Sequence, residues 1–138
     1  IARSTNNFAE TIRKVLESLN GQHNFRLEIE DKEKSHMFYL SVGEFKRLFR
    51  LSIPHIQTHE NKPFVDIRIN ALKRRLGLEN TKKLLNELSK IPGFEWVKDC
   101  NIKREFIWKY LTPPEQASMK KLKQELTNWL LKLSTLSN

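Results

Sequence analysis

Two groups of side chains have the chemistry that metal ions and hydrolytic reactions require, and the histidines come first. His55 and His59 stand four residues apart, a spacing that on a helix directs two imidazoles at one ion. Pro54 and the polar residues around this pair argue against a continuous helix, and no third ligand stands at a suitable distance. We therefore expect the pair to lie in a surface loop, and the sequence predicts neither a metal site nor a cofactor site.

The carboxylates form the second group, because a metal-dependent nuclease holds its ion with acidic residues on neighbouring strands. A carboxylate on one strand with Glu-x-Lys on the next is the pattern expected of such a site. Glu28-x-Glu30 and Asp66-x-Arg68 match it only in part. The chain has no glycine-rich phosphate loop and no Gly-x-Ser-x-Gly motif. The sequence thus favours a protein without catalytic residues and leaves a nuclease with Asp66 in its site as an alternative.

The charge of the chain indicates a polyanionic partner. Lys and Arg number 25 against 16 Asp and Glu, a formal net charge of +9. Residues 1–70 hold 11 basic and 9 acidic residues, a difference of +2, whereas residues 71–138 hold 14 and 7, a difference of +7. Because Lys and Arg release condensed counterions from a nucleic acid, this asymmetry favours nucleic-acid binding by the second half. A solvated surface that only maintains solubility is the alternative.

The elements that position these cations are predicted in the segment 70–111. A short helix over 71–76 ends at Gly77, Leu78 packs back into the core, and a second helix runs to about Lys90. The expected caps are Asn70 for the first helix and Asn80 or Thr81 for the second. After Pro92 and Gly93, strands over 94–97 and 102–111 form a hairpin with its turn at 98–101.

Helix, tight turn, helix and hairpin in this order resemble a winged-helix DNA-binding domain. The residues that carry the resemblance are Leu72, Leu76, Gly77, Leu78, Leu84, Leu85 and Leu88, with a basic hairpin tip at Lys98, Lys103 and Arg104. In such domains the second helix enters the major groove of duplex DNA. The resemblance implies that the DNA-facing residues are Lys73, Arg74, Arg75, Asn80, Thr81, Lys82, Lys83, Asn86, Lys90, Lys103 and Arg104. Among them, Asn80, Thr81 and Asn86 are the candidates for base contacts, and the cations are candidates for phosphate contacts.

The predicted hairpin also carries aromatic residues, namely Phe94, Trp96, Phe106, Trp108 and Tyr110. Aromatic residues that alternate along a strand generally face the core, and this is the interpretation we favour. Exposed aromatics beside basic residues would instead stack the unpaired bases of RNA or of single-stranded DNA.

The rest of the chain predicts an α+β fold, a small antiparallel sheet with flanking helices and a winged-helix-like second half. One apolar stripe indicates a helix over 8–19, and alternation indicates strands over 25–30, 38–42 and 65–69. Ser41 and Glu44 form a capping box that predicts a short helix over 44–50. The Pro-bounded segment 52–63 is expected to be a loop.

A long amphipathic helix is predicted over 113–136. Its apolar residues follow a seven-residue repeat: Met119, Leu122, Leu126, Trp129, Leu133 and Leu136. This stripe packs across its own domain or else pairs with a second copy or docks a protein partner, which is the alternative to nucleic-acid binding. We expect one domain over 1–138. The missing initiator Met indicates either a trimmed chain or a fragment of a longer protein, and the second alternative allows a further domain upstream.

Composition bears on the location of the chain. No apolar stretch is long enough to span a membrane, and the first residues show no secretory signal. The single cysteine, Cys100, cannot form an internal disulfide, which favours a reducing compartment and a packing role for the thiol. We expect a cytoplasmic protein with no membrane contact, associated with the nucleoid or the nucleus if it binds DNA.

Overall fold

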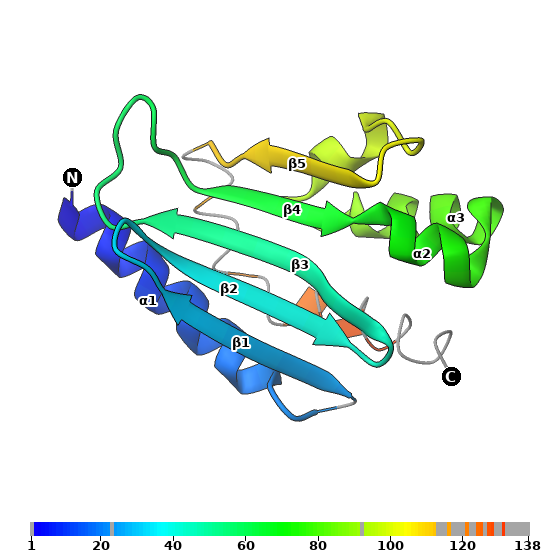
Figure 1. The fold of residues 1–138 in the computed structure, drawn as a ribbon, viewed down its shortest axis with the longest axis horizontal. Coiled ribbons are helices and arrows are strands. Elements are labelled where there is room, and N and C mark those ends of the chain that lie inside the picture. The colour runs from blue at the N-terminus through cyan, green and yellow to red at the C-terminus, as the bar shows by residue number, and fades with distance from the viewer. Residues whose placement is uncertain are drawn as a thin grey trace.

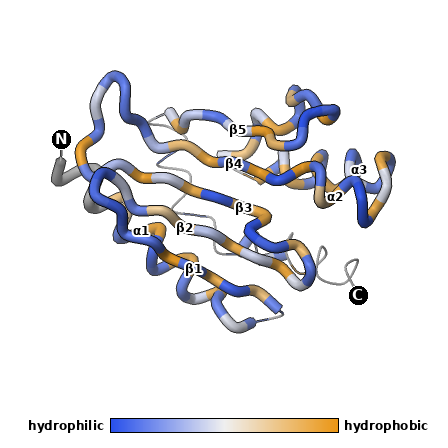
Figure 2. The backbone as a smooth tube through the Cα atoms, in the orientation of Figure 1, coloured by the Kyte–Doolittle hydropathy of each residue, from blue (hydrophilic) through white to orange (hydrophobic). Residues whose placement is uncertain are grey.

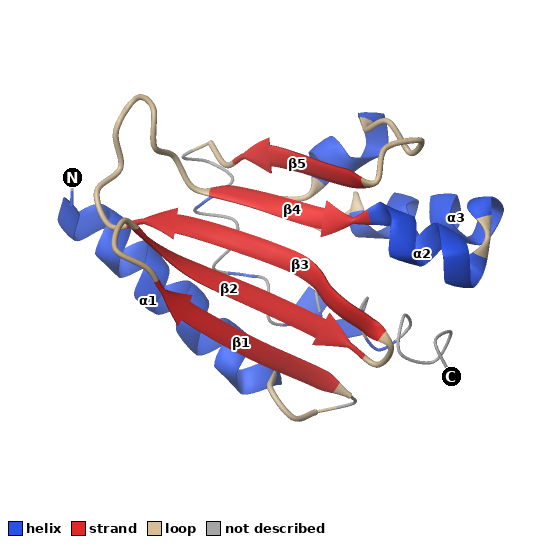
Figure 3. Ribbon diagram, viewed as in Figure 1, coloured by secondary structure: helices blue, strands red, loops and turns tan. Residues whose placement is uncertain are grey.

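A five-stranded antiparallel sheet organises the computed structural model, with the strands in the order β1-β2-β3-β4-β5 (Figure 1). The structure describes residues 2–22, 24–91 and 93–112, and beyond these 116, 121, 124–125, 127–128 and 131. The elements, shown by type in Figure 3, are α1 (Ala2–Leu19), β1 (Phe25–Asp31), β2 (Ser35–Val42), β3 (Phe45–Pro54), β4 (Phe64–Arg68), α2 (Ile69–Leu76), α3 (Leu78–Leu88), the 3₁₀ helix η1 (Glu95–Asp99) and β5 (Phe106–Tyr110). The predicted α+β class with a small antiparallel sheet is confirmed.

Helix α1 covers one face of the sheet and lies behind the strands in Figure 1. The predicted apolar stripe is buried there, at Phe8, Ile12, Leu16 and Leu19. The helix begins six residues earlier than the predicted start at Phe8. Burial of one stripe against a sheet, rather than intrinsic propensity, supplies most of the stability of such a helix.

The face of the sheet toward α1, here called the core face, carries the alternating apolar residues of the strands. Figure 2 shows the hydropathy changing between neighbouring positions along the strands. Across the sheet, Leu40 is opposite Phe49, Phe49 is opposite Ile67, and Ile67 is opposite Ile107. All four are buried. The strands predicted over 25–30, 38–42 and 65–69 are thereby confirmed as β1, β2 and β4, within a few residues at each end.

The short helix predicted over 44–50 is wrong, because residues 45–50 belong to strand β3. The register of β2 with β3 shifts between Leu40 and Val42, and Arg47 takes a φ of 49° in the irregular region. Ser41 Oγ accepts a hydrogen bond from the Arg47 amide at 2.8 Å instead of capping a helix. Phe45, Leu48 and Phe49 stand three and four residues apart in the sequence, as in a helical stripe, and the bulge allows all three to be buried in a strand. The strand continues to Pro54, so the loop is 55–63.

The hairpin predicted over 94–111 is also wrong. Residues 95–99 form η1, in which the Val97 amide donates to the Phe94 carbonyl at 3.0 Å. Phe94 and Val97 are both buried, and their three-residue spacing places them on one side of a 3₁₀ helix. The second predicted strand, 102–111, is confirmed in part as β5, but β5 pairs with β4 instead of with 94–97. The chain therefore lacks the wing that the winged-helix resemblance implies at this place.

The helix pair is present as α2 and α3, and Gly77 separates the two helices with a φ of 81°, as expected. Leu78 does not pack into the core, because it opens α3 and is 47% exposed. The predicted caps are wrong as well: α2 begins at Ile69 after Arg68, and α3 begins directly after Gly77, neither with a side-chain capping bond. A single glycine thus replaces the longer predicted turn.

The helix predicted over 113–136 falls almost wholly outside the described residues, as do Met119, Leu122, Leu126, Trp129, Leu133 and Leu136. Within the described part of the chain, no helix has the length and apolar character needed to cross a membrane.

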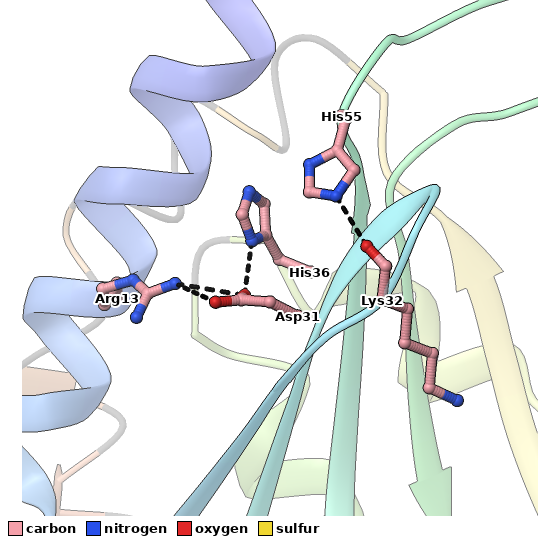
Figure 4. A network of polar contacts seen from close by, with 5 residues as sticks. All are labelled: Arg13, Asp31, Lys32, His36 and His55. Carbon is pink, nitrogen blue, oxygen red and sulfur yellow. Dashed lines mark hydrogen bonds and ion pairs between the residues drawn. The ribbon is translucent and has the colours of Figure 1, made fainter.

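A polar network ties α1 to the β1–β2 turn (Figure 4). Arg13 Nη2 donates to Asp31 Oδ1 at 3.2 Å, and His36 Nδ1 donates to the same oxygen at 2.6 Å. The rings of His36 and His55 meet edge to face with centroids 4.3 Å apart. The His36 hydrogen bond and the Arg13 charge hold the pKa of Asp31 below the ordinary value of an aspartate side chain, 3.8.

This lowered pKa makes a prediction for acid stability. The folded protein binds the Asp31 proton less readily than the unfolded chain, so the stabilisation is present above about pH 4 and is lost as the pH falls through the lowered pKa. We expect Asp31→Asn to reduce the free energy of unfolding at pH 7 by only about 0.2–1 kcal/mol, because solvent screens an exposed pair. Urea unfolding at pH 7 and at pH 2.5 measures the effect; a deficit that persists at the lower pH would contradict the assignment.

Candidate nucleic-acid interface

One face of α3 carries the exposed residues that the sequence assigned to DNA. Helical periodicity turns Thr81, Leu84, Leu85 and Leu88 toward the core. The opposite face is exposed and carries Lys82, Lys83 and Asn86. Together with Lys90, which is exposed in the turn after the helix ends at Leu88, these residues are here called the α3 stripe. Lys82 Nζ lies 3.7 Å from Glu79 Oε1, an exposed pair one turn apart that solvent screens strongly. The stripe therefore presents three lysines and one amide to solvent along α3 and the turn after it.

Two residues predicted to contact bases, Asn80 and Thr81, use their side chains in hydrogen bonds within the protein. Thr81 is fully buried, and its Oγ1 donates to the Gly77 carbonyl at 2.8 Å, so it cannot reach a ligand from this position. Asn80 is exposed, but its Nδ2 donates to the Leu76 carbonyl at 3.1 Å. Both side chains bond back to the carbonyl four residues earlier, which polar side chains near helix starts often do. Asn86 remains the exposed amide on the stripe.

The cations of α2 lie on a different surface from the α3 stripe. A hollow of about 300 Å³ between α2 and the β2–β3 turn is lined by Glu44, Phe45, Lys46, Arg68, Asn70, Ala71, Arg74 and Arg75. Arg75 Nη1 lies 2.7 Å from Glu44 Oε2, so one of the four cations is already paired. Arg68 Nη1 donates to the Lys46 carbonyl. Lys73 is half-buried on the same helix. Sequence reasoning missed Lys46 and Arg68, which come from separate strands and share no linear motif.

The remaining predicted cations follow η1. Lys103 and Arg104 are exposed in the turn before β5. Lys98 joins Lys82 and Asn86 around a hollow of about 280 Å³ beside α3. The structure thus brings the α3 stripe together with the basic end of η1, although no hairpin forms there.

The second face of the sheet, here called the open face, has no described element over it in Figure 1. One row of paired residues crosses all five strands as Glu28, Tyr39, Arg50, Asp66 and Trp108. A parallel row is Glu30, Met37, Ser52, Phe64 and Tyr110. Acidic and basic groups neutralise one another on the first three strands, where Arg47 Nη2 donates to Glu28 Oε2 at 2.8 Å.

Aromatic residues dominate the β5 edge of this face. Phe106, Trp108 and Tyr110 are exposed, contrary to the expectation that the aromatic strand faces the core. Phe94 is buried as expected, and Trp96 packs against the core. Beside Trp108 and Tyr110 lies a hollow of about 410 Å³ that reaches under the loop 55–63. Its cationic lining residues are Lys34, Arg50 and Lys62.

The residues weighed for metal chemistry do not assemble in the described part of the chain, where no group of three His, Cys, Asp or Glu could hold an ion. His55 Nε2 donates to the Lys32 carbonyl at 2.8 Å, and His59 is exposed in the loop 55–63, as predicted. Asp66 is paired with Arg50. Glu28 is three strands away in the same row, roughly 14 Å at the usual strand spacing. Burial raises the pKa of the Cys100 thiol, which disfavours the reactive thiolate.

Comparison with known proteins leaves the class of this fold open. No protein-family model, no curated protein and no solved structure matches the chain.

Proposed function

We propose that this chain is a non-catalytic nucleic-acid-binding domain that engages duplex DNA through α3. The observation that supports this proposal is the α3 stripe, with Lys82, Lys83 and Asn86 on one exposed helical face and Lys90 exposed in the turn that follows the helix. An α-helix fits the major groove of B-DNA, where lysines reach phosphates or guanine and an asparagine amide pairs with adenine. Four buried residues anchor the opposite side of α3, so the helix presents its stripe from a rigid support.

The surroundings of α3 favour contact with the phosphate backbone on its η1 side. Helices α2 and α3 extend beyond the end of β4, away from α1 and the β1–β2 turn (Figure 1). Lys98 stands next to Lys82 and Asn86, and Lys103 and Arg104 follow in the turn before β5. In the proposal these residues replace the wing of a winged-helix domain. The α2 cations around the hollow at Arg74 provide a second group of phosphate contacts.

A salt titration tests this assignment. We expect Lys82→Glu/Lys83→Glu to weaken duplex binding at low salt by about 10-fold to 100-fold and to reduce the slope of log K against log[salt] by about 2, because each lost phosphate contact removes close to one released counterion. Fluorescence anisotropy with a labelled duplex of about 20 base pairs at several salt concentrations measures both quantities.

Lys14→Glu/Lys32→Glu is the matched control. It makes the same change in net charge with two exposed lysines on α1 and in the β1–β2 turn, far from α3. We expect it to leave the slope unchanged. Equal losses in the two variants would mean that net charge rather than the α3 stripe controls binding, and the proposal would then be wrong.

The predicted protein-docking role of the C-terminal stripe rests on residues outside the described part of the chain, so it stays a prediction.

A further inference from the structure

We propose that the β5 edge of the open face is a separate binding site for the unpaired bases of a single-stranded nucleic acid, which stack on Phe106, Trp108 and Tyr110. The site lies on the sheet and uses none of the α3 stripe. Binding at this site can therefore be tested independently of duplex binding.

The exposure of the aromatic row is the first observation. Phe106, Trp108 and Tyr110 are 43%, 53% and 45% exposed, and they project from alternate positions of one strand onto the same face. A single exposed aromatic residue needs no explanation, but three adjacent ones form a contiguous apolar patch of the kind that marks an interaction site. The side of β5 that faces the core instead carries Ile107, which is buried.

The rings are held in place before any ligand binds. Trp108 and Tyr110 meet edge to face with centroids 5.1 Å apart, and Phe64 on β4 meets Trp108 in the same manner at 6.2 Å. Lys62 Nζ lies 5.8 Å from the centroid of Tyr110. Rings fixed by their neighbours lose little conformational freedom on binding, so the stacking free energy of a base is retained.

The charges beside the row fit a phosphate backbone. The hollow of about 410 Å³ next to Trp108 and Tyr110 has Lys34, Lys62 and Arg50 in its lining. It also contains Asp66, which Arg50 neutralises, and Glu60 on the loop. At the Phe106 end of the row, Arg104 lines a hollow of about 290 Å³ together with Phe106 and Trp108. Cations therefore lie near both ends of the aromatic row.

These features select one class of occupant. Aromatic side chains flanked by Lys and Arg form the usual platform for unpaired bases, since every base has a π-face and every nucleotide a phosphate. The bases of a duplex are already stacked on one another and cannot use such a platform. A second copy or an apolar protein partner would cover the rings but would leave the flanking lysines without anions. The shared chemistry of single-stranded DNA and RNA thus fits best.

The experiment measures anisotropy with labelled oligonucleotides of about 12 nucleotides, one of thymidines and one of uridines, beside the labelled duplex. We expect Trp108→Ala to weaken binding of the single strands by about 5-fold to 150-fold, the range that loss of one stacked base produces, and to leave duplex binding unchanged. Trp108→Phe keeps a ring and should retain most of the affinity. The two oligonucleotides show which sugar the site prefers.

Leu78→Ala is the matched control, because it truncates an exposed apolar residue on α3 away from the row. We expect it to leave single-strand binding unchanged. Circular dichroism of Trp108→Ala establishes that the fold is intact, and Tyr110→Ala provides a second test on the same row.

Two results would overturn the proposal. Single-strand affinities that are equal in the wild type, Trp108→Ala and Tyr110→Ala would exclude stacking on this row. A wild-type dimer in sedimentation that Trp108→Ala converts to a monomer would assign the face to a second copy instead. Failure of the α3 proposal looks different, because Lys82→Glu/Lys83→Glu would then leave duplex binding intact while single-strand binding still depended on Trp108.

Discussion

Replacing Phe38 by alanine should lower the free energy of unfolding by about 3–5 kcal/mol, the usual cost of deleting a buried aromatic ring. Phe38 is 1% exposed on the core face of β2, opposite Leu51 on β3. Its removal leaves a cavity between the sheet and α1, where the neighbouring side chains can collapse only in part. Urea unfolding followed by circular dichroism measures the change through the midpoint at a constant m-value.

Phe106→Ala is the matched control, since it makes the same substitution on the opposite face of the sheet. Its ring is 43% exposed and buries much less surface than that of Phe38, so we expect a smaller loss of about 1–2 kcal/mol. Comparable losses in the two variants would contradict the orientation of β5 and would place the aromatic row in the core. The pair of variants therefore tests the feature on which the single-strand site depends.

The orientation of β5 could not be predicted from its own residues, because both sides of the strand carry apolar groups. Phe106, Trp108 and Tyr110 alternate with Ile107 and Lys109, and the larger apolar side was expected to face the core. The register with β4 decides the question, because Ile107 is opposite the buried Ile67. This information comes from the neighbouring strand and is absent from the local pattern.

Elements whose own residues show a regular apolar pattern could be predicted from the sequence. Helix α1 and strands β1, β2 and β4 each carry a regular apolar stripe or alternation with the period of their element type. The bulge near Arg47 and the 3₁₀ helix η1 were not predicted, because in each the spacing of the buried apolar residues differs from that of a regular strand or α-helix. Gly77 was predictable as a helix stop, since its φ of 81° is the conformation that glycine adopts without strain.

The candidate sites differ in the same way, because one is formed by a single segment and the others combine several strands. The α3 stripe is local in sequence, and the winged-helix resemblance implied all four of its residues, Lys82, Lys83, Asn86 and Lys90, together with Asn80 and Thr81. Thr81 was assigned to the wrong side because the helix was expected to begin later than it does. The hollow at Arg74 and the open face combine residues from several strands, and a surface of this kind follows only from the pairing of the sheet.

The second large effect is expected at the ion pair that crosses the open face. Replacing Arg50 by methionine should lower the free energy of unfolding by about 2–3 kcal/mol, because Asp66 then keeps an unpaired charge in a buried position. The side chain of Asp66 is only 7% exposed, whereas that of Arg50 is 42% exposed. Access of water from the Arg50 side places the expected loss below the cost of breaking a fully buried pair.

Arg47→Met is the matched control on the same face. Arg47 pairs with Glu28, and both side chains are about half exposed, so solvent screens the pair and the loss should be much smaller. Adding Asp66→Leu to Arg50→Met should recover most of the lost stability, because an apolar pair of similar size avoids the cost of an isolated charge. A double variant that is less stable than Arg50→Met alone would contradict this account.

Arg50→Met should also weaken binding of a single strand, although Arg50 does not belong to the aromatic row. Asp66 is opposite Trp108 in the sheet register, and both line the hollow of about 410 Å³. Without Arg50, the Asp66 carboxylate repels a phosphate that Lys34 and Lys62 attract. We therefore expect Arg50→Met to reduce single-strand affinity and Arg50→Met/Asp66→Leu to restore part of it at low salt. Restored stability without any recovery of affinity would show that Arg50 binds the strand directly rather than by neutralising Asp66.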